Sequence, residues 1–122
     1  MPVRVLVVDD QLPYRRAMTA VVGATVGFEV VGEAASGEES IAVADAVRPQ
    51  LVLMDVNLPG IDGLEATRVL RTLPDAPVVL LLSTYDAAEG DAFAVESGAA
   101  GYVTKSELEP DRLTAAWAAA TG

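Results

Sequence analysis

The sequence predicts an α/β fold in which a parallel five-stranded sheet is covered by helices on both faces. Short apolar runs alternate with helix-patterned stretches along all 122 residues, which is typical of layered α/β domains. Several runs are apolar at consecutive positions, as in parallel strands buried on both faces. Right-handed crossovers between such strands place helices on both sides of the sheet. No linker, repeat or low-complexity tract interrupts the alternation, so we expect one domain over residues 1–122.

The first half of the chain contains three of the strands and two helices. The strands are expected at Val3–Val8, Phe28–Ala34 and Leu51–Met54. After the first strand, Pro13 stands where a helix can begin, because the first turn needs no backbone donor there. The second helix opens with a capping box, Ser36 followed by Glu39, and is expected to run to about Val47, before Pro49.

The second half repeats the same order. The remaining strands are expected at Pro77–Leu82 and Gly101–Thr104. Pro110 opens the last helix in the same way that Pro13 opens the first, and Gly98 is a suitable stop for the helix before the fifth strand. Two further capping boxes mark the other helix starts: Asp62 with Glu65, and Asp86 with Glu89.

Composition excludes several classes of function. The chain has no cysteine and no histidine, so disulfide frameworks, thiolate nucleophiles, Ser-His-Asp triads and histidine-based zinc sites are all absent. Its net charge of −10 and pI of about 4.2 argue against direct binding to nucleic acid, which requires clustered basic residues. No apolar run is long enough for a membrane span, and no signal peptide is evident. A cytoplasmic protein is therefore expected.

Polar residues follow four of the five predicted strands. Ligands of open parallel sheets bind beyond the carboxyl ends of the strands, so these side chains are candidates for one shared site. Three close carboxylates repel one another unless a cation lies between them, and a ligand set made only of oxygen suits Mg²⁺. Asn57 is placed to add a backbone carbonyl. The residues at the strand ends are Asp9, Asp10, Asp55, Ser83 and Lys105.

Lys105 is the only lysine of the chain. A lysine ammonium is a compact point charge, whereas an arginine guanidinium is a wide planar fork. Lys105 and Ser83 are thus candidates to donate hydrogen bonds to the oxygens of a phosphoryl group. Taken singly, each residue has an ordinary explanation, such as a helix N-cap, a turn or a solvated surface charge. Their coincidence at the ends of different strands favours a site.

Two competing motifs fail. The glycine-rich stretch from Gly32 to Gly37 is followed by Glu38 where a phosphate-binding loop requires lysine. Asp55 and Asn57 fall short of the paired acids of haloacid-dehalogenase-type phosphatases, although turnover of a phosphate ester would revive that alternative.

Four blocks of the sequence resemble the receiver domains of two-component response regulators. The resemblance covers nearly the whole chain, and the end of the sequence is most similar to the NarL/LuxR subfamily. It implies a CheY-like, flavodoxin-like fold with strand order 2-1-3-4-5. Ser106 follows the lysine, where many members of the family have proline. The matching blocks are VLVVDDQ (5–11), LVLMDVNLPGIDGLEA (51–66), VVLLLSTYD (78–86) and SGAAGYVTKS (97–106).

The resemblance implies a role for each candidate residue. Asp55 is the phosphoacceptor, Asp10 a direct ligand of Mg²⁺, and Asp9 a ligand through water. Asn57 contributes its carbonyl to the metal and, with Tyr85, influences the lifetime of the phosphoryl group. The phosphoryl-binding and switching residues are Ser83, with Thr84 as the neighbouring alternative hydroxyl, Lys105 and the switch aromatic Tyr102.

The implied function is a phosphorylation switch rather than an enzyme with a separate substrate. A sensor histidine kinase or a small acyl phosphate supplies the phosphoryl group, and the surface of the fourth helix, fifth strand and fifth helix responds. The resemblance allows for a homodimer on phosphorylation, and for DNA contact only through a C-terminal helix-turn-helix domain outside this chain. The alternative is a pseudo-receiver, a binding module of this fold that never takes phosphate.

Overall fold

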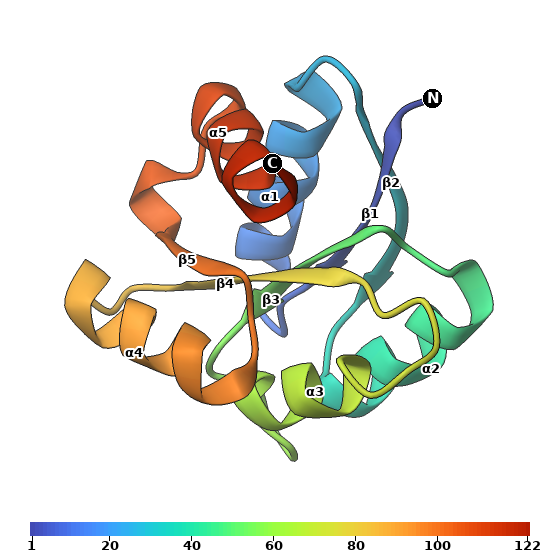
Figure 1. Ribbon diagram of the computed structural model, residues 1–122, viewed down its shortest axis with the longest axis vertical. Coiled ribbons are helices and arrows are strands. Elements are labelled where there is room, and N and C mark those ends of the chain that lie inside the picture. The colour runs from blue at the N-terminus through green and yellow to red at the C-terminus, as the bar shows by residue number, and fades with distance from the viewer.

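Five parallel strands form a single sheet in the computed structural model, which describes all residues from Met1 to Gly122. The order β2-β1-β3-β4-β5 confirms the expected topology (Figure 1). The strands are β1 (Val3–Val8), β2 (Phe28–Ala34), β3 (Leu51–Asp55), β4 (Val78–Ser83) and β5 (Gly101–Thr104).

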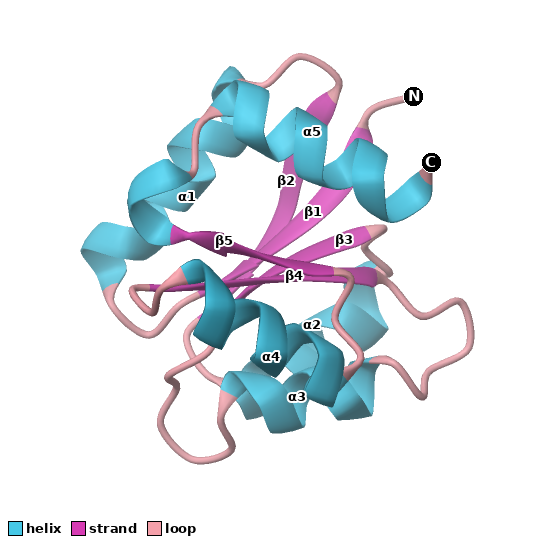
Figure 2. Ribbon diagram, turned by 60° about the vertical axis from the view of Figure 1, so that its left-hand side comes forward, coloured by secondary structure: helices cyan, strands magenta, loops and turns pink.

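Helices cover both faces of this sheet (Figure 2). Helices α1 and α5 lie on one face, and α2, α3 and α4 lie on the other. None of them combines the length and apolar character that a membrane crossing requires. The helices are α1 (Leu12–Ala24), α2 (Gly37–Val47), α3 (Gly63–Leu70), α4 (Ala87–Ser97) and α5 (Pro110–Thr121), with a short 3₁₀ helix, η1, at Lys105–Glu107.

The core consists of two apolar layers, one on each side of the sheet. Successive residues of a strand point to opposite faces, so β1 sends Leu6 and Val8 into the layer beneath α2–α4, and Val5 and Val7 into the layer beneath α1 and α5. All residues of β3 are buried. The central strands are therefore fixed on both faces, which makes the sheet a rigid base for the residues at its edge.

The N-cap side chain of each predicted capping box makes its expected hydrogen bond. The side chains of Ser36, Asp62 and Asp86 accept hydrogen bonds from the backbone N–H groups three residues later, at 3.0, 2.8 and 2.9 Å. Proline occupies the first turn of α1 and of α5, and Gly98 ends α4 in the left-handed conformation, with φ of 83°. These local signals place each helix at its predicted position.

The boundaries differ from the expectation at a few positions. β3 extends to Asp55 and β4 runs from Val78 to Ser83, because backbone pairing continues one residue into the polar ends. α3 stops at Leu70. Arg48, rather than a glycine, ends α2 in the left-handed region with φ of 51°, a conformation that the sequence pattern did not indicate.

Candidate functional site

The register of the sheet brings the polar strand ends together. Val8 pairs with Met54 across β1 and β3, so Asp9 and Asp55 follow at neighbouring positions. Ser83 pairs with Thr104 across β4 and β5, which sets Ser83 beside the start of η1. The resulting depression is lined by Asp10, Gln11, Tyr14, Asp55, Asn57, Ser83, Thr84 and Lys105.

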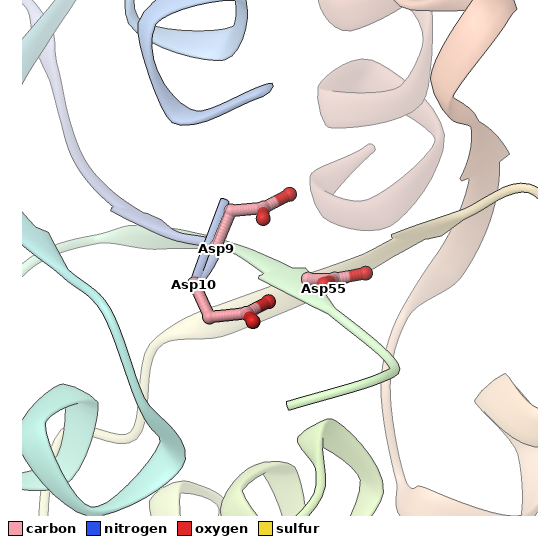
Figure 3. A group of neighbouring side chains, drawn as sticks. All are labelled: Asp9, Asp10 and Asp55. Carbon is pink, nitrogen blue, oxygen red and sulfur yellow. The ribbon is translucent and has the colours of Figure 1, made fainter. Parts of the chain in front are cut away.

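Three carboxylates cluster at the centre of this edge (Figure 3). Asp9 and Asp10 leave the end of β1 and Asp55 leaves the end of β3, and one oxygen of each lies within 4.8 Å of the others. Asp9 and Asp55 are buried and Asp10 is exposed. Such a group of oxygen ligands, open to solvent on one side, fits a hard divalent cation such as Mg²⁺.

The environment of Asp55 opposes its ionisation. Burial first, and the charge of Asp9 second, raise the pKa of Asp55 from 3.8 to about 6, although Lys105 acts in the opposite direction. A bound cation would stabilise the ionised form of such a carboxylate, because its positive charge offsets both the cost of burial and the repulsion from the neighbouring carboxylate.

Lys105 reaches into the acidic cluster from the end of β5. Its Nζ lies 2.8 Å from Oδ2 of Asp9 and 3.4 Å from Oδ1 of Asp55. Burial alone lowers the pKa of Lys105, but the hydrogen bond to Asp9 and the charges of Asp55 and Asp9 outweigh it and raise the pKa above its ordinary value. The lysine is therefore a permanent cation beside Asp55.

Asn57, Ser83 and Tyr85 form a chain of hydrogen bonds along the rim. The Asn57 amide donates to Oγ of Ser83 at 3.4 Å, and the Tyr85 hydroxyl donates to Oδ1 of Asn57 at 3.3 Å. The Tyr85 ring packs edge-on against Phe93, with ring centroids 5.2 Å apart. Of the two candidate hydroxyls, Ser83 is buried in this chain, whereas Thr84 is exposed beside it.

Tyr102, the predicted switch aromatic, lies inward. Its side chain is 6% exposed, and its hydroxyl donates to the backbone carbonyl of Tyr85 at 2.6 Å. Burial, followed by the charges of Asp86 and Glu89, raises the pKa of Tyr102 to about 12. The hydrogen bond to Tyr85 links Tyr102 to the segment that follows Ser83.

The structure also adds residues that sequence reasoning missed. The Tyr14 ring lies under the ammonium of Lys105, with Nζ 3.9 Å from the ring centroid, a cation–π contact. The backbone N–H of Gln11 donates to Oδ1 of Asp9 at 2.9 Å. Gln11 lies in the turn after β1, and Tyr14 lies in the first turn of α1. Both are close to Asp9 and Asp10 in the sequence, and this closeness was the signal that could have identified them as site residues.

Comparison with known proteins gives consistent matches. The model of the response regulator receiver domain family matches residues 5–118. The chain is 48% identical to the response regulator GacA of Pseudomonas protegens over 107 residues, which cover 84% of this chain and 48% of that protein. It is 33% identical to the nitrate/nitrite response regulator protein NarL of Escherichia coli, over 99% of this chain and 56% of NarL. The chain thus spans about half the length of these relatives.

A solved structure matches over the same region. The crystal structure of a two-component response regulator of the LuxR family from Aurantimonas sp. SI85-9A1 superposes with a TM-score of 0.88, at 33% identity. The match covers 100% of this chain and 87% of that one.

Proposed function

This chain belongs to the family of response regulator receiver domains, which act in two-component signalling, and we propose that Asp55 is its phosphoacceptor. The observation that supports this proposal is the position of Asp55, buried at the end of β3 beside the carboxylate of Asp9 and the ammonium of Lys105. The raised pKa of Asp55 supports it further, because strongly shifted carboxyl groups concentrate at functional sites.

The metal site proposed here consists of Asp9, Asp10, Asp55 and the backbone carbonyl of Asn57. Mg²⁺ at this position would offset the negative charge that develops as a phosphoryl group approaches the carboxylates. Asp10, which is exposed, would bind the ion directly, and the buried Asp9 would act through water while it holds Lys105.

The proposed reaction is transfer of a phosphoryl group to an oxygen of Asp55. The donor is a phosphohistidine of a sensor kinase or a small acyl phosphate; its bond to phosphorus breaks as the new bond to Asp55 forms. Lys105 and Ser83 would donate hydrogen bonds to the transferred group, with Thr84 flanking the entrance. Catalysis by the chain is limited to this transfer and to the later hydrolysis of the acyl phosphate.

The proposed output is a change in the surface formed by α4, β5 and α5. A hydrogen bond drawing Ser83 toward the phosphoryl group would move the segment that ends at Tyr85, whose carbonyl accepts from Tyr102. Tyr102 would transmit this movement to the surface. A population shift of a few kcal/mol is sufficient for such a switch.

The proposed partners are a sensor histidine kinase and an output domain. Relatives of this chain include transcriptional regulators, such as the transcriptional regulatory protein YxjL of Bacillus subtilis, 36% identical over 98% of this chain. We infer that the switch controls a helix-turn-helix DNA-binding domain and allows a phosphorylation-dependent homodimer.

Labelling with acetyl phosphate tests the proposal. The wild-type chain should gain one phosphoryl group in the presence of Mg²⁺ and none when the metal is chelated, and Asp55→Asn should remain unlabelled. A wild-type chain that never takes phosphate would identify a pseudo-receiver instead, and labelling of the Asp55→Asn variant would place the acceptor elsewhere.

A further inference from the structure

The loop between β3 and α3 rests on the N-terminal end of α2. The backbone N–H of Ile61 in this loop donates to Oε2 of Glu38, a residue of the first turn of α2, at 3.2 Å. The two residues lie 23 positions apart in the sequence, so this contact joins two separate elements. The same loop contains Asn57, whose carbonyl belongs to the proposed metal site.

Two glycines make this close approach possible. A Cβ atom at Gly37 would lie 2.7 Å from Cγ1 of Ile61 and 2.8 Å from its carbonyl oxygen. A Cβ atom at Gly60 would lie 2.5 Å from the carboxylate of Glu38, and Gly60 has a φ of +74° that favours glycine. The loop therefore packs closely against the start of α2, with Ile61 on Gly37 and the Glu38 carboxylate on Gly60.

The other end of the loop is fixed to the sheet. The backbone N–H of Val56 donates to the Leu82 carbonyl at 3.0 Å, and that of Gly63 donates to the Val56 carbonyl at 2.8 Å. Leu58 is 9% exposed. Asn57 itself is exposed, so the direction of its carbonyl depends on how both ends of the loop are held.

We propose that Glu38 is a positioning residue for the metal site: it holds Ile61 against α2 and thereby fixes the loop that presents the Asn57 carbonyl. This inference rests on the proposed function, because it assumes that Mg²⁺ binds beside Asn57. Glu38 acts through the loop and touches neither the metal nor the phosphoryl group. A glutamate that served only the helix dipole of α2 would need no contact with the loop.

Two substitutions at Glu38 separate the hydrogen bond from the charge. Glu38→Gln loses the charge but keeps a side-chain oxygen that accepts from Ile61, whereas Glu38→Ala loses both. Any general effect of charge on a divalent cation appears in both variants, and only the positioning effect is specific to Glu38→Ala. Titration with Mg²⁺, followed by ¹H–¹⁵N chemical shifts, should show affinity reduced about three- to tenfold in Glu38→Ala, as expected for one lost hydrogen bond.

A third variant displaces the loop without a change in charge. Gly37→Ala places a methyl group against Ile61, while alanine favours the helix itself, so Mg²⁺ affinity should fall although α2 remains formed. Asp45→Ala is the matched control for Glu38→Ala, because Asp45 is another exposed carboxylate on the same helix. Its Mg²⁺ affinity should equal that of the wild type.

Hydrogen exchange at the Ile61 amide provides a readout that needs no metal. The amide should exchange slowly in the wild type and in Glu38→Gln, and faster in Glu38→Ala. Equal loss of Mg²⁺ affinity in both Glu38 variants, or unchanged affinity in Glu38→Ala, would overturn the positioning role. A wild-type chain that binds no Mg²⁺ would instead refute the proposed metal site, and the positioning role with it.

Discussion

The ring of Tyr102 lies directly against the backbone of Gly90. A Cβ atom at position 90 would lie only 1.9 Å from Cδ2 of Tyr102 and 2.1 Å from its Cε2. Gly90 stands within α4, where glycine costs a helix about 1 kcal/mol relative to alanine. The missing side chain creates the space that the buried tyrosine ring occupies, so this glycine determines whether Tyr102 can lie inward.

Gly90→Ala should therefore displace Tyr102. The added methyl group cannot be accommodated without moving the ring or α4, and we expect a net loss of about 1–3 kcal/mol in the free energy of unfolding in urea. The pKa of Tyr102 should fall from about 12 as the ring becomes exposed. Gly23→Ala is the control, because its added carbon would meet no atom within 4 Å other than its chain neighbours and the nearby backbone of its own helix. An equal effect of both substitutions would contradict the role of Gly90.

Asp55→Asn should stabilise the metal-free protein at neutral pH. The folded-state pKa of about 6 exceeds the ordinary value of 3.8, so the folded protein holds this proton more tightly than the unfolded chain does. The protonated form of Asp55 therefore favours the folded state; this contribution to the free energy of unfolding is fully present below about pH 4 and is lost as the pH rises through 6. The variant, which does not ionise there, should exceed the wild type by on the order of 2–3 kcal/mol above pH 7.

The measurement is the difference in free energy of unfolding between wild type and Asp55→Asn as a function of pH, with Mg²⁺ chelated. This difference should be small at pH 4 and should reach its full value above pH 7. Added Mg²⁺ should reduce it, because the ion binds the folded wild type and stabilises it. A difference that does not vary with pH would contradict the raised pKa.

Lys105→Met should raise the pKa of Asp55 further. The charge of Lys105 and its hydrogen bond both lower that pKa, and methionine supplies neither. The carboxyl ¹³C shift of Asp55 during a pH titration measures the effect. Lys105→Arg keeps the charge, so its effect should be smaller; an unchanged pKa of Asp55 in Lys105→Met would mean that the ammonium does not act on Asp55.

Tyr85 should prolong the life of the phosphorylated form. Its hydroxyl donates to Asn57 and its ring packs on Phe93 at the rim of the site, so it can hinder an attacking water. Tyr85→Ala should shorten the lifetime of the phosphoryl group several-fold, measured as its decay after the donor is removed. Tyr85→Phe keeps the ring and separates bulk from the hydrogen bond, and an unchanged lifetime in Tyr85→Ala would exclude this role.

The sequence predicted the parts of the fold that local patterns determine. The ranges of β1, β2 and β5 agree with the expectation residue for residue, and the N-cap side chains of the three predicted capping boxes make their hydrogen bonds. Most of the candidate site followed from the strand ends, because parallel topology brings those residues together. The structure does place Asp9, Asp10, Asp55, Asn57, Ser83 and Lys105 at one edge of the sheet.

Contacts between distant elements could not be predicted in the same way. Three contacts join segments that are distant in the sequence and meet only in the packed fold. They are the Glu38–Ile61 hydrogen bond, the packing of Tyr102 against Gly90, and the contact of Lys105 with Tyr14. In the sequence alone, Glu38 is an ordinary polar residue of a helix, and Gly90 is a residue that weakens one. Their significance depends on what lies opposite them.

The most direct test of Asp55 as the phosphoacceptor is to identify the phosphorylated residue. After incubation with acetyl phosphate and Mg²⁺, borohydride reduction converts an aspartyl phosphate to homoserine, which peptide mass spectrometry can locate. Homoserine is expected at position 55 in the wild type and at no position in Asp55→Asn. Modification of Asp9 or Asp10 instead, or a wild-type chain that remains unmodified, would contradict this assignment.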